Sequence, residues 1–131
     1  MDDHFTNAAI VAALRLAQHL GDYTLILSNG PQFLVRGFAQ AWNVDEWRST
    51  EYAVDKHNNL LEITSLLLGE DKATCVVRTM ERLQIERKQV TAYSDSHLDL
   101  PLLLTAGTPV AVNPDRKLRK ISEINQWRVV E

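Results

Sequence analysis

The segment that most constrains the fold is YSDSHLDLPLL, residues 93–103, where polar residues separate two apolar runs. Residues 90–93 predict a short buried strand, and the run that begins near residue 100 predicts a helix. Asp95 and Asp99 then lie four residues apart at the carboxyl end of a strand. Such a pair can be solvated beside a helix cap at Ser96, or it can converge on one hard cation. Mg2+ is usually held by one or two carboxylates together with phosphate oxygens.

Strand-like and helix-like apolar patterns alternate along the rest of the chain. Strands are predicted at residues 23–27, 109–112 and 127–130, in addition to 90–93. Residues 51–54 and 60–64 predict a hairpin around the loop 55–59. Helices are predicted at residues 10–20 with a stop at Gly21, from Pro31 to Trp42, at 70–83 and from about 98 to Gly107. A last helix is predicted with Asn113 as its N-cap, followed by Pro114 and the acidic Asp115 in its first turn.

The predicted helices each carry an apolar face. The inward residues of the second helix are predicted to be Leu34, Phe38, Ala41 and Trp42. Those of the third are Ala73, Val76, Val77, Met80 and Leu83, and those of the last are Leu118, Ile121 and Ile124. This alternation predicts an α/β fold: an open, mostly parallel sheet with helices on both faces and one small hairpin.

Composition excludes several classes of protein. Fourteen Lys and Arg against seventeen Asp and Glu give a net charge of −3, so nucleic acid is not an expected partner. Cys75 is the only cysteine, which excludes an intrachain disulfide and a cysteine-based zinc site. No stretch of 18 apolar residues occurs, and the first residues lack a signal-peptide pattern. We therefore expect a cytoplasmic protein without a membrane segment.

The string from Tyr93 to Leu103 closely resembles the last signature motif of the haloacid dehalogenase (HAD) superfamily, in its phosphoserine-phosphatase-like branch. The resemblance implies a HAD-like Rossmannoid fold and a Mg2+ cofactor, weakly bound or vestigial, with Asp95 and Asp99 as metal ligands. It extends from about residue 8 to residue 130. Residues 1–131 would then form one HAD-like core domain, equivalent to the carboxyl-terminal two-thirds of a typical relative.

Two earlier segments resemble the phosphate-binding motifs of the same family. Ser28, Asn29 and Gly30 follow a predicted strand, and the resemblance implies that they bind phosphate through the Ser hydroxyl and backbone N–H groups. A Gly-containing turn beside a helix amino terminus offers such donors. Lys72 resembles the family's catalytic, phosphate-binding lysine. A cation in the first turn of a helix opposes the helix dipole, so this lysine requires a compensating charge.

The sequence contains no Asp-x-Asp, the motif whose first carboxylate is the nucleophile of HAD phosphatases. Loss of a covalent nucleophile costs orders of magnitude in rate. We therefore expect the chain alone to be inactive. One hypothesis is a remnant or split half of a Mg2+-dependent phosphomonoester hydrolase, active only when complemented by an Asp-x-Asp segment. The alternative is a catalytically inactive module for phosphate, metal or assembly.

The partners expected from these hypotheses are a phosphorylated small molecule or phosphate, and a second polypeptide. In the family's sheet, the strand that bears Asp-x-Asp lies between the strands that end at Ser28 and Asp95. Without it, both strands would expose an apolar edge. This predicts a homo-oligomer, most simply a dimer, or a complementing amino-terminal fragment.

Overall fold

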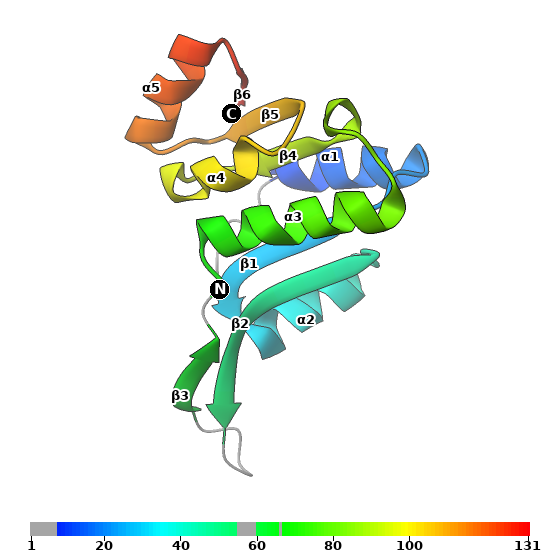
Figure 1. Ribbon diagram of the computed structural model, residues 1–131, viewed down its shortest axis with the longest axis vertical. Helices are drawn as coiled ribbons and strands as arrows, with labels where there is room; N and C mark the ends of the chain where they lie inside the picture. The colour runs from blue at the N-terminus through cyan, green and yellow to red at the C-terminus, as the bar shows by residue number, and fades with distance from the viewer. Residues whose placement is uncertain (1–7, 55–59, 66) are drawn as a thin grey trace. The chain divides into compact units, whose positions relative to one another are not determined.

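The computed structural model describes residues 8–54, 60–65 and 67–131 (Figure 1). The chain divides into two compact units, Met1–Leu67 and Leu68–Glu131. Each unit contains a three-stranded sheet and helices, so the predicted α/β class is confirmed. The strands belong to two sheets, whereas one open sheet was predicted. That residues 1–131 form a single domain stays a prediction.

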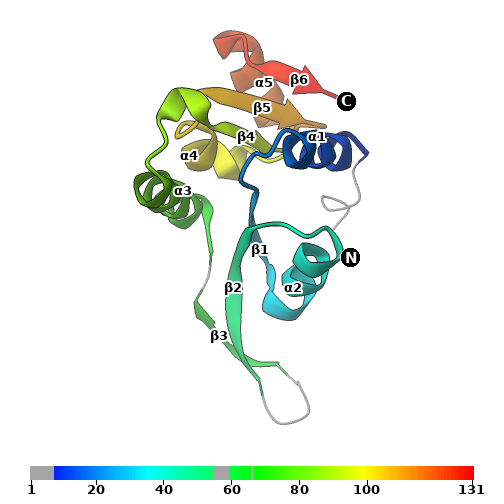
Figure 2. The ribbon, with the colours of Figure 1, turned by 90° about the vertical axis from the view of Figure 1, so that its right-hand side faces the viewer.

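The first unit is built on a βαβ element with a hairpin added to it. Its sheet has the order β1-β2-β3; β1 pairs with β2 in parallel and β2 pairs with β3 in antiparallel fashion (Figure 2). The helix α2 connects the two parallel strands and packs against both of them. The elements are α1 (Ala8–His19), β1 (Leu25–Pro31), α2 (Gln32–Ala41), β2 (Glu46–Val54) and β3 (Leu60–Ser65).

The two predicted helices, the strand and the hairpin of this unit are present. The buried residues of α2 are Val35 and Ala39, and the predicted inward residue Ala41 is exposed. The hairpin strands pair as predicted, while the loop 55–59 lies outside the described residues. Gly21 follows α1 with a φ of 80°, which suits its predicted role as a stop.

The first strand continues beyond the predicted break at Ser28. Ser28 pairs with Ser49, and the next pair is Pro31 with Thr50, so the ladder carries an irregularity between them. A proline lacks the N–H that a regular ladder requires, but the end of a strand tolerates it. The helix therefore begins at Gln32, one residue later than the sequence predicted.

The second unit is a parallel sheet of order β4-β5-β6 with its helices. A core of small and branched side chains packs where α4 and α5 meet the sheet: Ala92, Leu103, Ala106, Ala111 and Leu118. The elements are α3 (Gly69–Leu83), η2 (Arg87–Gln89), β4 (Thr91–Ser94), η3 (His97–Asp99), α4 (Leu100–Leu103), β5 (Thr108–Val112), α5 (Arg116–Asn125) and β6 (Arg128–Val130).

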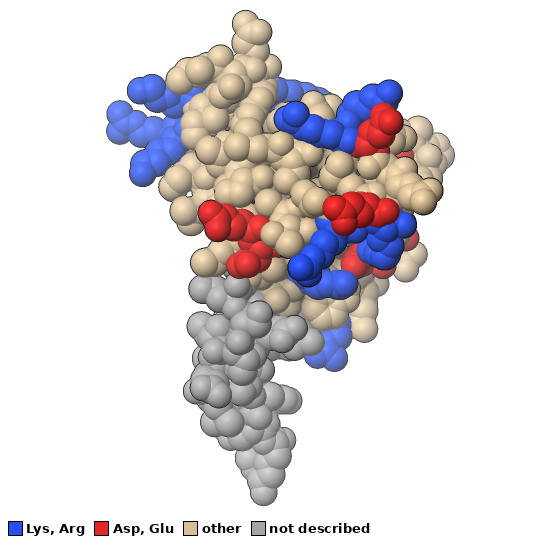
Figure 3. Space-filling model, in the orientation of Figure 1, with Lys and Arg blue, Asp and Glu red and all other residues tan. Residues whose placement is uncertain are grey.

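The last helix, α5, separates a basic face from a buried face. Leu118 and Ser122 are completely buried, and the Ser122 hydroxyl donates to the Leu118 carbonyl oxygen at 2.8 Å. Basic side chains gather over α5 in Figure 3, and the helix contributes Arg116, Lys117, Arg119 and Lys120. The predicted inward residue Ile124 is instead 72% exposed, because the buried face is centred on positions 118 and 122.

Two further details of this unit differ from the sequence predictions. Asp115 is the N-cap of α5, and the predicted cap, Asn113, precedes it with a φ of 42°. On α3, the predicted inward residue Val77 is 43% exposed. Within the part of the chain that the structure describes, no helix is both long and apolar enough to cross a bilayer.

Candidate active site

A buried ion pair links α3 to the segment after β4. The Lys72 ammonium donates to the Asp99 carboxylate at 2.9 Å, and the side chains are only 7% and 13% exposed. Lys72 lies in the first turn of α3, where the helix dipole disfavours a cation. Asp99 therefore supplies the compensating charge that the sequence required. Both ions are removed from water, so separating them would leave uncompensated charge in the interior.

Ser94 holds the other oxygen of the same carboxylate. It is the last residue of β4, is fully buried, and donates its hydroxyl to Asp99 Oδ2 at 2.7 Å. The same hydroxyl oxygen accepts from the Ser96 backbone N–H at 3.1 Å. Each oxygen of Asp99 thus has its own donor, and the carboxylate is fixed toward Lys72.

Asp95 lies at the carboxyl end of β4, between Ser94 and Ser96, and is half-buried. Its carbonyl oxygen accepts from the Asp115 backbone N–H at 2.8 Å. Ser96 caps η3 by accepting from the Leu98 N–H at 3.1 Å. The cap that the sequence offered as an alternative to a metal site is therefore present, and it coexists with the charged cluster.

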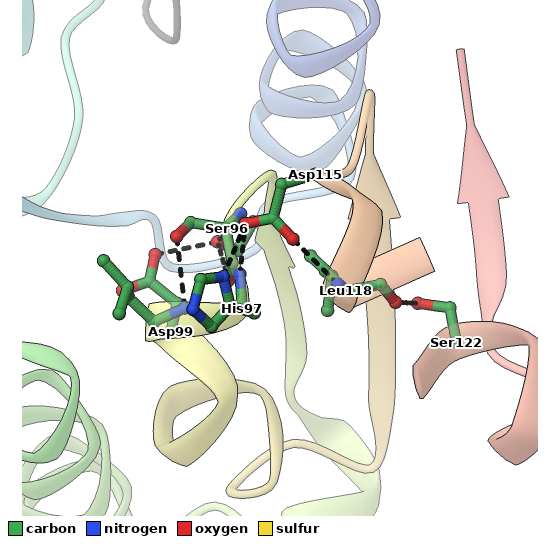
Figure 4. A network of polar contacts seen from close by, with 8 residues as sticks. Ser96, His97, Asp99, Asp115, Leu118 and Ser122 are labelled. Carbon is green, nitrogen blue, oxygen red and sulfur yellow. Dashed lines mark hydrogen bonds and ion pairs between the residues drawn. The ribbon is translucent and has the colours of Figure 1, made fainter. Parts of the chain in front are cut away.

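His97 and Asp115 form a second contact between this loop and the rest of the unit. One oxygen of Asp115 accepts from the His97 backbone N–H and lies 2.9 Å from the ring nitrogen Nδ1 (Figure 4). The other oxygen accepts from the Leu118 N–H at 2.8 Å and so caps α5. A single carboxylate joins the loop after β4 to the first turn of α5.

The charge of Asp115 is stabilised by these contacts. Partial burial acts to raise the pKa of this carboxyl. The hydrogen bonds from the Leu118 and His97 backbones, and the contact with the His97 ring, act in the opposite direction. Together they outweigh the desolvation and hold the pKa of Asp115 below its ordinary value.

Three of the residues predicted from sequence, Lys72, Asp95 and Asp99, lie in the second unit, which brings Lys72 and Asp99 into contact. The other three, Ser28, Asn29 and Gly30, belong to β1 in the first unit, where Ser28 is buried. Sequence reasoning assigned no role to Ser94, and gave Asp115 only a structural role at the start of the helix. Ser94 lies inside the quoted motif, which was the available signal. The Asn-Pro-Asp segment was the signal for Asp115.

Carboxylate oxygens are suitable ligands for Mg2+. Among the described residues, no group of three or more His, Cys, Asp or Glu side chains is arranged to hold a metal ion. A Mg2+ ion held by one carboxylate with phosphate oxygens and water would need fewer protein ligands. That Asp95 and Asp99 ligate such an ion stays a prediction, and both oxygens of Asp99 already accept hydrogen bonds in this structure.

The second unit thus combines a buried lysine–aspartate ion pair with a second aspartate, Asp95, at the end of a parallel strand. The chain matches the family model of haloacid dehalogenase-like hydrolases over residues 2–104. This match covers more than half of the chain, so the chain belongs to the haloacid dehalogenase-like hydrolase family. The predicted resemblance to its phosphoserine-phosphatase-like branch is confirmed.

Several known proteins are similar to this chain. A phosphoserine phosphatase of Mycobacterium tuberculosis is 39% identical over 67 residues, which are 51% of this chain and 22% of that protein. A histidinol-phosphatase of Neisseria meningitidis is 31% identical over 119 residues, or 86% of this chain and 53% of that protein. A substrate-bound phosphoserine phosphatase superposes with a TM-score of 0.80 at 15% identity, covering 92% of this chain and 56% of that one.

These three comparisons differ in what they support. The solved structure shares too little sequence to show more than the fold. The chain spans between about a fifth and just over half of the length of the two curated relatives and the solved structure. The activity and substrates of those longer proteins can therefore be assigned to this chain only as proposals.

Proposed function

We propose that this chain supplies the Mg2+- and phosphate-binding part of a HAD-type phosphomonoester hydrolase. The observation that carries the proposal is the buried Lys72–Asp99 pair, which Ser94 holds at the end of β4, one residue before Asp95. A desolvated lysine is a strong partner for an anion, and a neighbouring carboxylate suits a cation that bridges to the same anion. The substrate class is a phosphorylated small molecule.

The roles within this proposal differ between residues. Lys72 neutralises charge on the phosphate, and Asp99 keeps Lys72 oriented while no anion is bound. Asp95 holds Mg2+, which when bound would polarise the phosphate oxygens. Ser28, Asn29 and Gly30 keep the phosphate-binding role that the family resemblance gives them.

The proposed chemistry requires a nucleophile, and the 131 residues contain no Asp-x-Asp. Hydrolysis is therefore proposed only in the presence of a segment that supplies this motif. A module that binds phosphate and metal without catalysis is the alternative. Turnover of p-nitrophenyl phosphate after mixing with such a segment, and not before, would favour the hydrolase. Binding without turnover under both conditions would favour the module.

The binding site itself can be tested on the isolated chain. We expect inorganic phosphate to bind in the millimolar range in a Mg2+-dependent manner, as measured by calorimetry. Lys72→Gln keeps a hydrogen-bond donor for Asp99 but removes the charge, so it should weaken phosphate binding at least tenfold. Lys88→Gln is the matched control, because the Lys88 side chain is 81% exposed and forms an ion pair with Glu86. Absence of Mg2+-dependent phosphate binding to the wild-type chain would contradict the proposal.

We further propose that the protein forms a homo-oligomer, most simply a dimer. In the described sheets, β1 and β4 are edge strands, each with one strand neighbour. The outer backbone groups of such edges can pair with another chain. Light scattering across a dilution series to low micromolar concentration should keep reporting a dimer. A stable monomer of 14.9 kDa would contradict this proposal.

A further inference from the structure

The Asp115 carboxylate makes more contacts than capping a helix requires. An N-cap needs one side-chain oxygen for one backbone N–H, as Ser96 provides for Leu98. Asp115 uses Oδ1 for that purpose, with Leu118 as donor at 2.8 Å. Its Oδ2 then accepts from both donors of His97, the backbone N–H and the ring, each at 2.9 Å. The second oxygen therefore contacts His97, in the loop after β4.

The backbone of Asp115 adds a contact to the same loop. Its N–H donates to the Asp95 carbonyl oxygen at 2.8 Å. The main chain of Asp115 thus holds the loop at residue 95. Its side chain holds the loop at residue 97 (Figure 4). The Asp95 carbonyl is part of the residue proposed to hold Mg2+.

We propose that Asp115 is a positioning residue that fastens residues 95–97 to the first turn of α5 and thereby fixes the Asp95 carboxylate for the cation. The inference rests on the proposed function, because it assumes that Asp95 holds Mg2+. Groups that orient a metal ligand without touching the metal commonly change affinity by about 10- to 100-fold. The helix α5 acts here as the rigid support.

The test uses the whole chain, the probe Mg2+ alone, and amide NMR signals of residues 95–97. Asp115→Asn keeps an oxygen for Leu118, since Asn is as good an N-cap as Asp. In this variant the Oδ2 atom of Asp115 is replaced by an amide NH2 group, which cannot accept hydrogen bonds from the His97 donors. Asp45→Asn is the matched control: Asp45 Oδ2 also accepts from two donors of one residue, the Thr24 N–H at 2.7 Å and hydroxyl at 3.0 Å. It lies in the first unit.

In the wild-type chain we expect a saturable Mg2+-induced shift at the Asp95 amide. Asp115→Asn should weaken the affinity about tenfold. It should also speed hydrogen exchange at the His97 amide without Mg2+, while the Leu118 amide stays protected. Asp45→Asn should stay within about twofold of the wild-type Mg2+ affinity. Asp115→Ser, which keeps a cap but cannot reach His97, should behave like Asp115→Asn.

Three results would overturn the inference, and they differ in whether the proposed metal site is refuted as well. Unchanged Mg2+ affinity in Asp115→Asn would refute the positioning role and leave the metal site intact. Absence of any saturable shift at Asp95 in the wild-type chain would refute the metal site, and the inference with it. Failure of both the Asn and Ser variants to fold would show that Asp115 acts on stability alone.

Discussion

Gly69, the first residue of α3, lies close to the backbone of η3, and its replacement by Ala should separate the two elements. A Cβ at this position would collide with the Leu98 carbonyl oxygen. It would also lie 3.4 Å from the Leu98 carbonyl carbon and from Pro101 Cδ. The Leu98 carbonyl belongs to the backbone, so it cannot rotate away as the end of a flexible side chain can. Either α3 or η3 must therefore move.

The movement would act directly on the buried ion pair. Lys72 lies three residues after Gly69 on α3, and Asp99 follows Leu98 in η3. A shift of about 1 Å between the two elements would take the 2.9 Å contact of Lys72 with Asp99 beyond hydrogen-bonding range. Overpacking of this kind typically costs about 1–3 kcal/mol. The weakened buried pair would add to that cost, because both ions stay largely desolvated.

Gly37→Ala provides a control with the opposite expected sign. Gly37 lies inside α2, and a Cβ there would meet nothing within 4 Å. Replacement of a glycine in a helix interior should stabilise by about 0.5–1 kcal/mol. Urea denaturation at 25 °C should therefore give a lower free energy of unfolding for Gly69→Ala and a higher one for Gly37→Ala. In addition, Gly69→Ala should weaken phosphate binding. Equal stabilisation by both substitutions would refute the close approach at Gly69.

Three further predictions concern neighbouring positions. Ser94→Ala removes the donor to Asp99 Oδ2 at a fully buried site, so it should lower the free energy of unfolding by about 1–3 kcal/mol in urea titrations; an unchanged value would contradict the bond. Gln84 ends α3 with a φ of 55°, so Gln84→Gly should stabilise by about 0.5–1 kcal/mol, and destabilisation would count against this reading of the cap. The lowered pKa of Asp115 contributes stability that is present above the ordinary carboxyl pKa and is lost as pH falls through the folded-state pKa. Acid titration should therefore show that the advantage of the wild type over Asp115→Asn shrinks as pH falls through this window, and a constant difference would contradict it.

The order of strands and helices could be predicted because each element carries its own apolar period. The ends of the elements could be predicted less well where pairing with a neighbouring strand determines them. The strand β1 runs on to Pro31 because β2 offers it a partner at Thr50, which the local sequence does not reveal. Likewise, Ile124 fits a helical stripe, but the sheet covers α5 along Leu118 and Ser122.

The candidate site was predictable as a set of residue types and less so as a set of contacts. The requirement of Lys72 for a compensating charge followed from its position on α3. The identity of that charge, Asp99, did not, because 27 residues separate the two. The contact of His97 with Asp115 spans 18 residues and also depends on the fold. Side chains of this kind meet only after the strands have been aligned.

These contacts explain how so polar a segment can sit against a hydrophobic core. Asp99, which Ser94 also holds, ties the loop to α3 through Lys72, and Asp115 ties the loop to α5 through His97. Among the described residues, no buried side-chain nitrogen or oxygen lacks a hydrogen-bond partner. A half-satisfied network would cost more than an apolar one of the same shape. The two ties are therefore expected to be coupled: a double-mutant cycle between Ser94→Ala and Asp115→Asn should give an interaction energy above about 0.5 kcal/mol. Strict additivity would mean that the loop responds to each tie independently and that Asp95 is not held between them.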